Sequence, residues 1–140
     1  MIRNTLLTLA LGMSLGVQAQ KNVEAAFRSP FDFPLLLSAN FGELRPNHFH
    51  NGLDIKTQGV TGKPIHSIAD GYVSRIMVLH GGYGQAIFVT HPNGYTSVYG
   101  HVVSFAPKVQ EYVRAYQYEH ETFVCDLHPE PGQLPVKAGD

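Results

Sequence analysis

The sequence predicts a single, mainly β domain in which an antiparallel sheet is accompanied by one short helix. Between residues 64 and 101, segments rich in β-branched and aromatic residues recur about every ten positions. Asp-Gly, Gly-Gly and Asn-Gly pairs separate these segments, and such pairs favour tight turns because they tolerate positive φ. The chain has 140 residues, of which 44% are hydrophobic, so it is long enough for one globular domain with a core of moderate size.

The first 19 residues have the features of a signal peptide. Arg3 gives a positive N-terminal region, residues 6–17 are mostly apolar, and Val17-Gln18-Ala19 has the small-x-small pattern at which signal peptidase cuts. A membrane anchor is the alternative interpretation, but the apolar stretch is shorter than the ~20 residues that a spanning helix needs. We therefore expect an exported protein, in the periplasm or outside the cell, with no stable membrane span after cleavage.

The mature chain divides into a lead-in segment, residues 20–40, and a domain, residues 41–140. Pro30 and Pro34 disfavour a regular helix in the lead-in segment, so we expect it to be extended and packed against the domain. Four strands are expected in the domain, at residues 64–69, 72–80, 85–90 and 95–101.

Residues 109–118 form the only predicted helix. Val109, Tyr112, Val113 and Tyr116 recur at positions i, i+3, i+4 and i+7, which places them on one helical face. We expect this short amphipathic helix to cover one end of the sheet.

Charge and cysteine content narrow the classes of function. Lys and Arg total 10 against 11 Asp and Glu, and no basic run is present, which argues against a nucleic-acid partner. Cys125 is the only cysteine, so no disulfide can form within the chain. We expect Cys125 to act as a small buried hydrophobic residue.

His50-Asn51-Gly52-Leu53-Asp54 is the strongest candidate for a metal site. Hydrolytic zinc usually takes three protein ligands from His and Asp or Glu and leaves the fourth position for water. On a straight strand His50 and Asp54 would lie ~13 Å apart, so the chain must bend, and Asn51-Gly52 bends easily. A second pair with this spacing, His66 and Asp70, is interpreted as structural, because Asp70 precedes a glycine in a predicted turn where it would bond local backbone.

Six short motifs occur in one order and together resemble the lysostaphin-type (LytM-like) zinc metallopeptidases that cut peptidoglycan. They are Asn40-Phe41-Gly42-Glu43-Leu44-Arg45, His50-Asn51-Gly52-Leu53-Asp54, Ala69-Asp70-Gly71-Tyr72-Val73, Gly82-Tyr83-Gly84, His91-Pro92-Asn93-Gly94-Tyr95 and Val98-Tyr99-Gly100-His101. The resemblance implies the mainly β fold of those peptidases, an antiparallel sheet or sandwich of the duplicated hybrid motif type. It also implies Zn²⁺ as the cofactor, His50 and Asp54 as zinc ligands, and His101 as a catalytic residue.

The resemblance also suggests roles for other polar residues. Arg45 is expected to hold acidic or carbonyl groups of a peptide substrate, with a structural salt bridge as the alternative. His48 is interpreted as an exposed loop residue, with a supporting or substitute ligand as the alternative. The remaining histidines are expected to be surface groups. They are His80, His91, His120 and His128.

The third zinc ligand is the part of the pattern that does not appear. The family supplies it, with a second catalytic histidine, from a C-terminal His-x-His motif, and no His-x-His follows His101 here. Residues 135–140 resemble the turn before that motif. We therefore expect a domain that is C-terminally incomplete, and a 140-residue polypeptide that is inactive alone and poorly stable.

The leading functional prediction is an exported zinc endopeptidase that cleaves the stem or cross-link peptides of peptidoglycan. A non-catalytic relative that binds cell wall or activates other cell-wall hydrolases is the runner-up, although such relatives generally lose the ligands that this chain keeps. A sugar-transport phosphocarrier domain is the third alternative. The predicted signal peptide argues against it, because that phosphotransfer is cytoplasmic.

Overall fold

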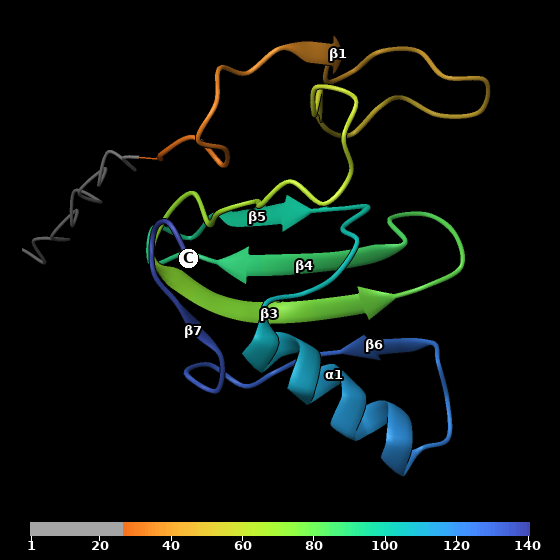
Figure 1. Ribbon diagram of the computed structural model, residues 1–140, viewed down its shortest axis with the longest axis vertical. Helices are drawn as coiled ribbons and strands as arrows, with labels where there is room; N and C mark the ends of the chain where they lie inside the picture. The colour runs from red at the N-terminus through yellow and green to blue at the C-terminus, as the bar shows by residue number, and fades with distance from the viewer. Residues whose placement is uncertain (1–26) are drawn as a thin grey trace, which may run out of the picture.

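The computed structural model describes residues 27–140, and its largest unit is a five-stranded antiparallel sheet. The strands are β3 (Gly71–Val78), β4 (Gln85–Thr90), β5 (Thr96–Tyr99), β6 (Cys125–Leu127) and β7 (Pro135–Val136). Their order is β5-β4-β3-β6, and β7 pairs with the start of β3 beside β6 (Figure 1). The predicted signal peptide, residues 1–19, lies outside the described residues.

Three of the four predicted strands are confirmed: β4 matches its expected segment, β5 falls within its own, and β3 begins one residue and ends two residues earlier than expected. The fourth prediction, a strand at residues 64–69, is wrong. Its backbone groups bond to several different segments: His66 N–H donates to Pro30 O at 2.8 Å and Ser67 N–H to Asp140 O at 2.8 Å. Because no single neighbour runs alongside, the segment cannot form a ladder.

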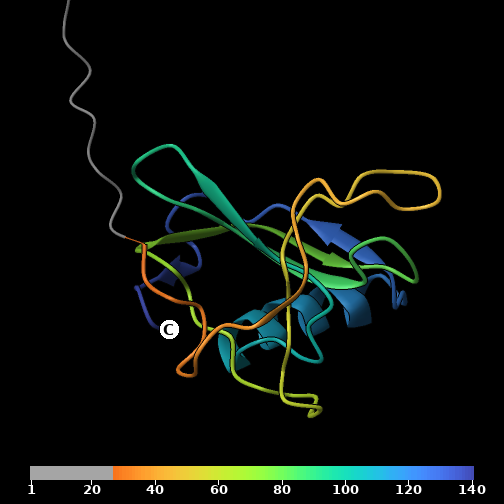
Figure 2. The same ribbon diagram turned by 90° about the horizontal axis from the view of Figure 1, so that it is seen from above.

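The predicted helix is present as α1 (Pro107–Glu119), which begins two residues earlier than the apolar pattern. Pro107 occupies the first turn, where its missing N–H costs no hydrogen bond. Val109 and Val113 are buried, and Tyr112 and Tyr116 are partly buried against the same core, as the spacing predicts. The helix lies against a face of the sheet and not at its end, because its buried residues pack on β3 and β6 (Figure 2).

The hydrophobic core lies between this face of the sheet and α1. It is formed by Val73, Ile76, Val78, Phe105, Val109, Val113, Cys125 and Leu127. Cys125 is 5% exposed, so its predicted role as a buried hydrophobic residue is confirmed. Within residues 27–140, α1 is the only helix, and it is too short and too polar to cross a bilayer.

A separate two-stranded sheet joins the lead-in segment to the start of the domain. It consists of β1 (Leu37–Ala39) and β2 (Asp54–Ile55), which pair antiparallel with Ala39 opposite Asp54. Figure 1 shows β1 and the loop that follows it standing apart from the five-stranded sheet. The described part of the lead-in segment before β1, residues 27–36, contains no helix, as the two prolines predict.

Candidate metal and catalytic site

A hairpin between β1 and β2 positions the candidate metal ligands. Gly42 N–H donates to His50 O at 2.7 Å, and His50 N–H donates to Glu43 O at 2.8 Å. Arg45 N–H donates to His48 O at 2.9 Å, which closes the turn at the tip. His50 thus lies on the returning arm of the hairpin, and the chain bends at Gly52 before Asp54 begins β2.

The bend brings the two predicted zinc ligands together. His50 Nε2 lies 3.1 Å from Asp54 Oδ1. Two donor atoms bound to one tetrahedral zinc at 2.0–2.2 Å are about 3.4 Å apart, so this separation fits a shared ion to within a few tenths of an ångström. A Cβ at position 52 would lie 3.9 Å from His50 Nε2, an ordinary van der Waals distance, so residue 52 lies directly beside this nitrogen.

Asn40 fixes which ring nitrogen of His50 faces Asp54. His50 Nδ1 lies 2.9 Å from the backbone carbonyl oxygen of Asn40, and because a carbonyl can only accept, Nδ1 carries the proton. In the neutral imidazole, Nε2 then carries a free lone pair that is directed toward a carboxylate oxygen. Zinc-binding histidines commonly have this arrangement: one ring nitrogen is free to bind the metal, and the other donates a hydrogen bond to a carbonyl group.

Arg45 holds the other oxygen of the carboxylate. Its Nη2 lies 3.1 Å from Asp54 Oδ2 and 3.6 Å from a carboxylate oxygen of Glu43. The structural salt bridge that the sequence left open is therefore present. The predicted contact of Arg45 with a peptide substrate stays a prediction.

His101 comes from a different part of the fold, the end of the segment after β5. Its backbone has φ of 56°, a left-handed conformation that is uncommon for a residue with a side chain. The His101 N–H donates to Tyr83 O at 2.9 Å, and a Cβ on Gly84 would lie 3.7 Å from His101 Nδ1. The imidazole is therefore held beside the turn between β3 and β4, and it is exposed.

A large cavity of about 970 Å³ extends from His101 across the sheet. Its walls are mostly apolar and come from residues 57–67, from β3 and β4, from the connection between β5 and α1, and from the C-terminal residues, with Phe31 of the lead-in segment. Val73, Ile87 and Val89 form part of its floor. A cavity of this size and character can accept an extended peptide segment.

Among the described residues, only His50 and Asp54 come together as candidate metal ligands in this region. Residues 27–140 contain no group of three His, Cys, Asp or Glu side chains that could hold one metal ion. Within residues 27–140, His101 does not join His50 and Asp54 in such a group, and its catalytic role stays a prediction. His48 is exposed and its Nδ1 lies 2.6 Å from Asn47 Oδ1, so it does not substitute for the third ligand.

The second His-x-x-x-Asp pair does not come together, which supports its structural interpretation. His66 Nε2 lies 3.0 Å from Asp32, and its Nδ1 lies 3.0 Å from Gly139 O. Asp70 instead accepts from the Ala138 N–H at 2.9 Å and from Lys137 Nζ at 3.0 Å. The expectation that Asp70 bonds local backbone is wrong, because these partners lie more than sixty residues away in sequence.

These two donors change the acidity of Asp70. The Ala138 N–H and, next, the Lys137 ammonium group hold the pKa of this carboxyl below its ordinary value. Both favour the charged form.

His91 corrects another expectation, since it is 3% exposed and not a surface group. Its Nδ1 lies 2.8 Å from Asp70 O, and its Nε2 lies 2.9 Å from Ser97 Oγ. Ser97 Oγ lies 3.0 Å from the Tyr99 hydroxyl, which accepts from the Ile68 N–H at 3.0 Å. Burial of His91 is tolerated because both of its ring nitrogens have hydrogen-bond partners.

Gly71 makes room for the buried imidazole. A Cβ at this position would collide with the Thr90 carbonyl oxygen and would lie 3.1 Å from His91 Nδ1. In the sequence, His91 is only a histidine at the end of a predicted strand. It lies beside the Asp70-Gly71 pair only because β3 and β4 pair in this register, so the sequence alone did not indicate its burial.

Comparison with known proteins agrees with this geometry. The family model of peptidase family M23 matches residues 48–118, just over half of the chain, including His50, Asp54 and His101. Searches of curated proteins and of solved structures return no significant match. The LytM-like resemblance and the mainly β fold are confirmed. On the strength of the matched region, the chain belongs to peptidase family M23.

Proposed function

We propose that this chain is an exported zinc metallopeptidase that hydrolyses peptide cross-links of peptidoglycan. Membership of peptidase family M23 supports a metallopeptidase-like function on peptidoglycan peptides. The observation that carries the zinc assignment is the 3.1 Å separation of His50 Nε2 and Asp54 Oδ1, with Nδ1 of the same imidazole committed to Asn40. Export is supported by the sequence of residues 1–19.

Each residue has a separate task in this proposal. His50 and Asp54 would hold the metal, and Arg45 would keep the carboxylate of Asp54 oriented. Bound zinc supplies Lewis acidity, which activates water and polarises the scissile carbonyl. His101 would take the proton from the attacking water and return it to the leaving amine. Its imidazole makes no hydrogen bond with any residue of 27–140, so both ring nitrogens are available.

Zinc content measured together with hydrolysis tests this function. The purified 140-residue protein is titrated with zinc by calorimetry and incubated with peptidoglycan sacculi, and new amino termini are counted. With only two ligands in the described residues, the 140 residues alone should bind zinc weakly and hydrolyse little. His50→Ala should remove the residual binding. Unchanged zinc binding in His50→Ala would contradict the assignment.

A non-catalytic role in the cell wall is the second candidate, and one observation favours it: no third ligand is found within residues 27–140. The two candidates differ in how they respond to metal. A wall-binding protein should co-sediment with sacculi equally well with and without zinc. A peptidase should release amino groups, and only with zinc.

A further inference from the structure

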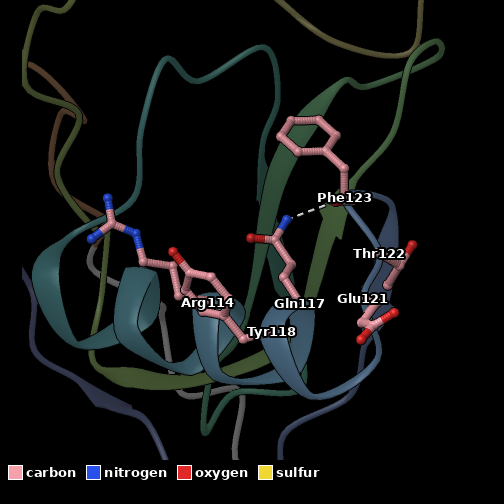
Figure 3. A pocket seen from close by; sticks show the side chains of 6 residues that line it. All are labelled: Arg114, Gln117, Tyr118, Glu121, Thr122 and Phe123. Atoms are coloured by element: carbon pink, nitrogen blue, oxygen red, sulfur yellow. Dashed lines mark hydrogen bonds between the residues drawn. The ribbon is translucent and has the colours of Figure 1, made fainter.

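A hollow of about 340 Å³ lies at the C-terminal end of α1, away from the metal ligands. Figure 3 shows its six lining side chains, which come from the last turns of the helix and from the loop that leads to β6. They are Arg114, Gln117, Tyr118, Glu121, Thr122 and Phe123. Glu121, Thr122 and Phe123 lie beyond residue 118, where the matched family region ends.

Hydrogen bonds hold this hollow in one shape. Gln117 Nε2 donates to the Phe123 carbonyl oxygen at 2.6 Å, a bond drawn dashed in Figure 3. Thr122 N–H donates to Gln117 O at 3.1 Å. Glu121 between them has φ of 48°, so the loop reverses sharply at the end of the helix. A loop fixed in this way needs little further ordering when a ligand binds.

Two aromatic rings at the hollow are directed to solvent. Tyr118 is 83% exposed and Phe123 is 64% exposed, although both carry large apolar faces. The imidazole of His80 stacks on Phe123, with ring centroids 6.0 Å apart and 23° between the ring planes. Exposed rings beside a preformed hollow provide flat surfaces on which the C–H face of a ligand ring can stack.

The polar side chains at the hollow offer both hydrogen-bond donors and an acceptor to a ligand. Arg114 can only donate hydrogen bonds and Glu121 can only accept them, and neither makes an ion pair or a side-chain hydrogen bond within residues 27–140. The two opposite charges give no preference for an anion such as phosphate. A hydroxyl group donates and accepts at once, so sugar hydroxyl groups can bond to either side chain while a C–H face of the sugar covers an aromatic ring.

We propose that this hollow binds a sugar ring of a glycan strand. It would hold the glycan part of the wall polymer while the cavity beside His101 receives the peptide part. The choice of a peptidoglycan sugar rests on the proposed function. The proposal that the hollow binds a sugar is independent of it, because the hollow shares no residue with the candidate metal site.

The test is a titration of the full 140-residue protein with a trisaccharide of β-1,4-linked N-acetylglucosamine, followed by two-dimensional NMR. Saturable shifts are expected at residues 114–123, with a Kd of about 1 mM, as suits a small ligand with few contacts. Phe123→Ala and Tyr118→Ala should each weaken binding about fivefold or more through lost stacking. Tyr95→Ala is the matched control, because Tyr95 is 64% exposed on the distant turn between β4 and β5.

Three results would overturn the proposal: no saturable shifts, unchanged affinity in Phe123→Ala and Tyr118→Ala, or equal shifts at residues 114–123 with a stem peptide alone. Thermal unfolding of each variant checks that it is folded. His50→Ala should bind the trisaccharide as the unchanged protein does, although it should lose zinc. If the unchanged protein itself bound the trisaccharide but no zinc, the proposed peptidase would be refuted and the glycan site would stand.

Discussion

The backbone carbonyl of Asn40 and the imidazole of His50 are joined at 2.9 Å through Nδ1, which leaves Nε2 to face Asp54. A main-chain acceptor is insensitive to side-chain mutation, so the orientation of His50 is fixed by the hairpin itself. The orientation of Asp54 depends instead on a side chain, Arg45, and that difference can be measured.

Arg45→Ala should weaken zinc binding about tenfold, because loss of an outer partner typically costs that much and Asp54 would be free to rotate. Arg45→Lys should recover part of the affinity, since it restores a positive charge without the planar guanidinium group. Zinc titration by calorimetry measures both. Equal affinity in all three proteins would show that Arg45 does not position the ligand.

His101→Ala should separate metal binding from catalysis. Loss of a general acid or base typically lowers the rate about 10²- to 10⁴-fold, whereas the ligands His50 and Asp54 are untouched. Zinc affinity should therefore remain within about twofold of that of the unchanged protein. The assay is peptide release from sacculi at zinc concentrations high enough to saturate the weak site, where the small zinc-dependent hydrolysis of the unchanged protein should disappear in His101→Ala. A parallel loss of zinc would assign His101 as a ligand.

Asp70→Asn should destabilise the protein at neutral pH and not in strong acid. The pKa of Asp70 is lowered from 3.8 in the folded state, first by the Ala138 N–H and then by Lys137. A carboxyl with a lowered folded pKa stabilises the fold above its unfolded pKa, and this stabilisation is lost as the pH falls through the folded value. Thermal unfolding of both proteins should show a difference in Tm at pH 7 that narrows steadily as the pH falls below 3.8. Glu111→Gln changes an exposed carboxylate without hydrogen bonds and should show no such difference.

Gly71→Ala should destabilise the fold by about 1–3 kcal/mol, because the added methyl group would press on the Thr90 carbonyl and on the buried His91 ring. Gly81→Ala is the matched control, since a Cβ there meets no atom within 4 Å. Urea unfolding measures both free energies. Equal stability of the two variants would mean that the β3–β4 pair can shift without cost.

Cys125 should react slowly with iodoacetamide in the native protein. Burial raises the pKa of its thiol, and the nearby charge of Asp126 raises it further, so little thiolate is present at pH 8. The native rate should be at least tenfold below that of a free cysteine and should rise to the free rate in denaturant. A native rate equal to the unfolded rate would show that the β6 edge opens readily.

Local patterns predicted the long elements of this fold well. The alternating segments that became β3 and β4 carry enough apolar residues to define their own period, and the same holds for α1. The strands of two or three residues, β1, β2, β6 and β7, were not predicted, because a segment that short is a strand only through its partner. The predicted strand at residues 64–69 is wrong because a strand also needs a partner: the composition of this segment suits a strand, but no strand lies beside it.

In the candidate site, too, contacts within one hairpin could be predicted from the sequence, whereas contacts between distant segments could not. The closeness of His50 and Asp54 followed from spacing and from Gly52, since both residues belong to one hairpin. The burial of His91 did not follow, because it requires the pairing of β3 with β4 and a carbonyl from Asp70 on another segment. The contact of Arg45 could be predicted in part. Its charge suggested a carboxylate partner, but only the structure of the hairpin shows that this partner is Asp54.

The hairpin between β1 and β2 also determines how a bound metal would leave. Every contact that positions His50 and Asp54 comes from residues 37–55, and the two strands pair only with each other among the described residues. A two-stranded ribbon is marginally stable by itself, so it can open while β3 and β4 remain paired. Release of zinc should then follow local opening, and hydrogen exchange should slow in residues 37–55 on metal binding while the central strands exchange as before.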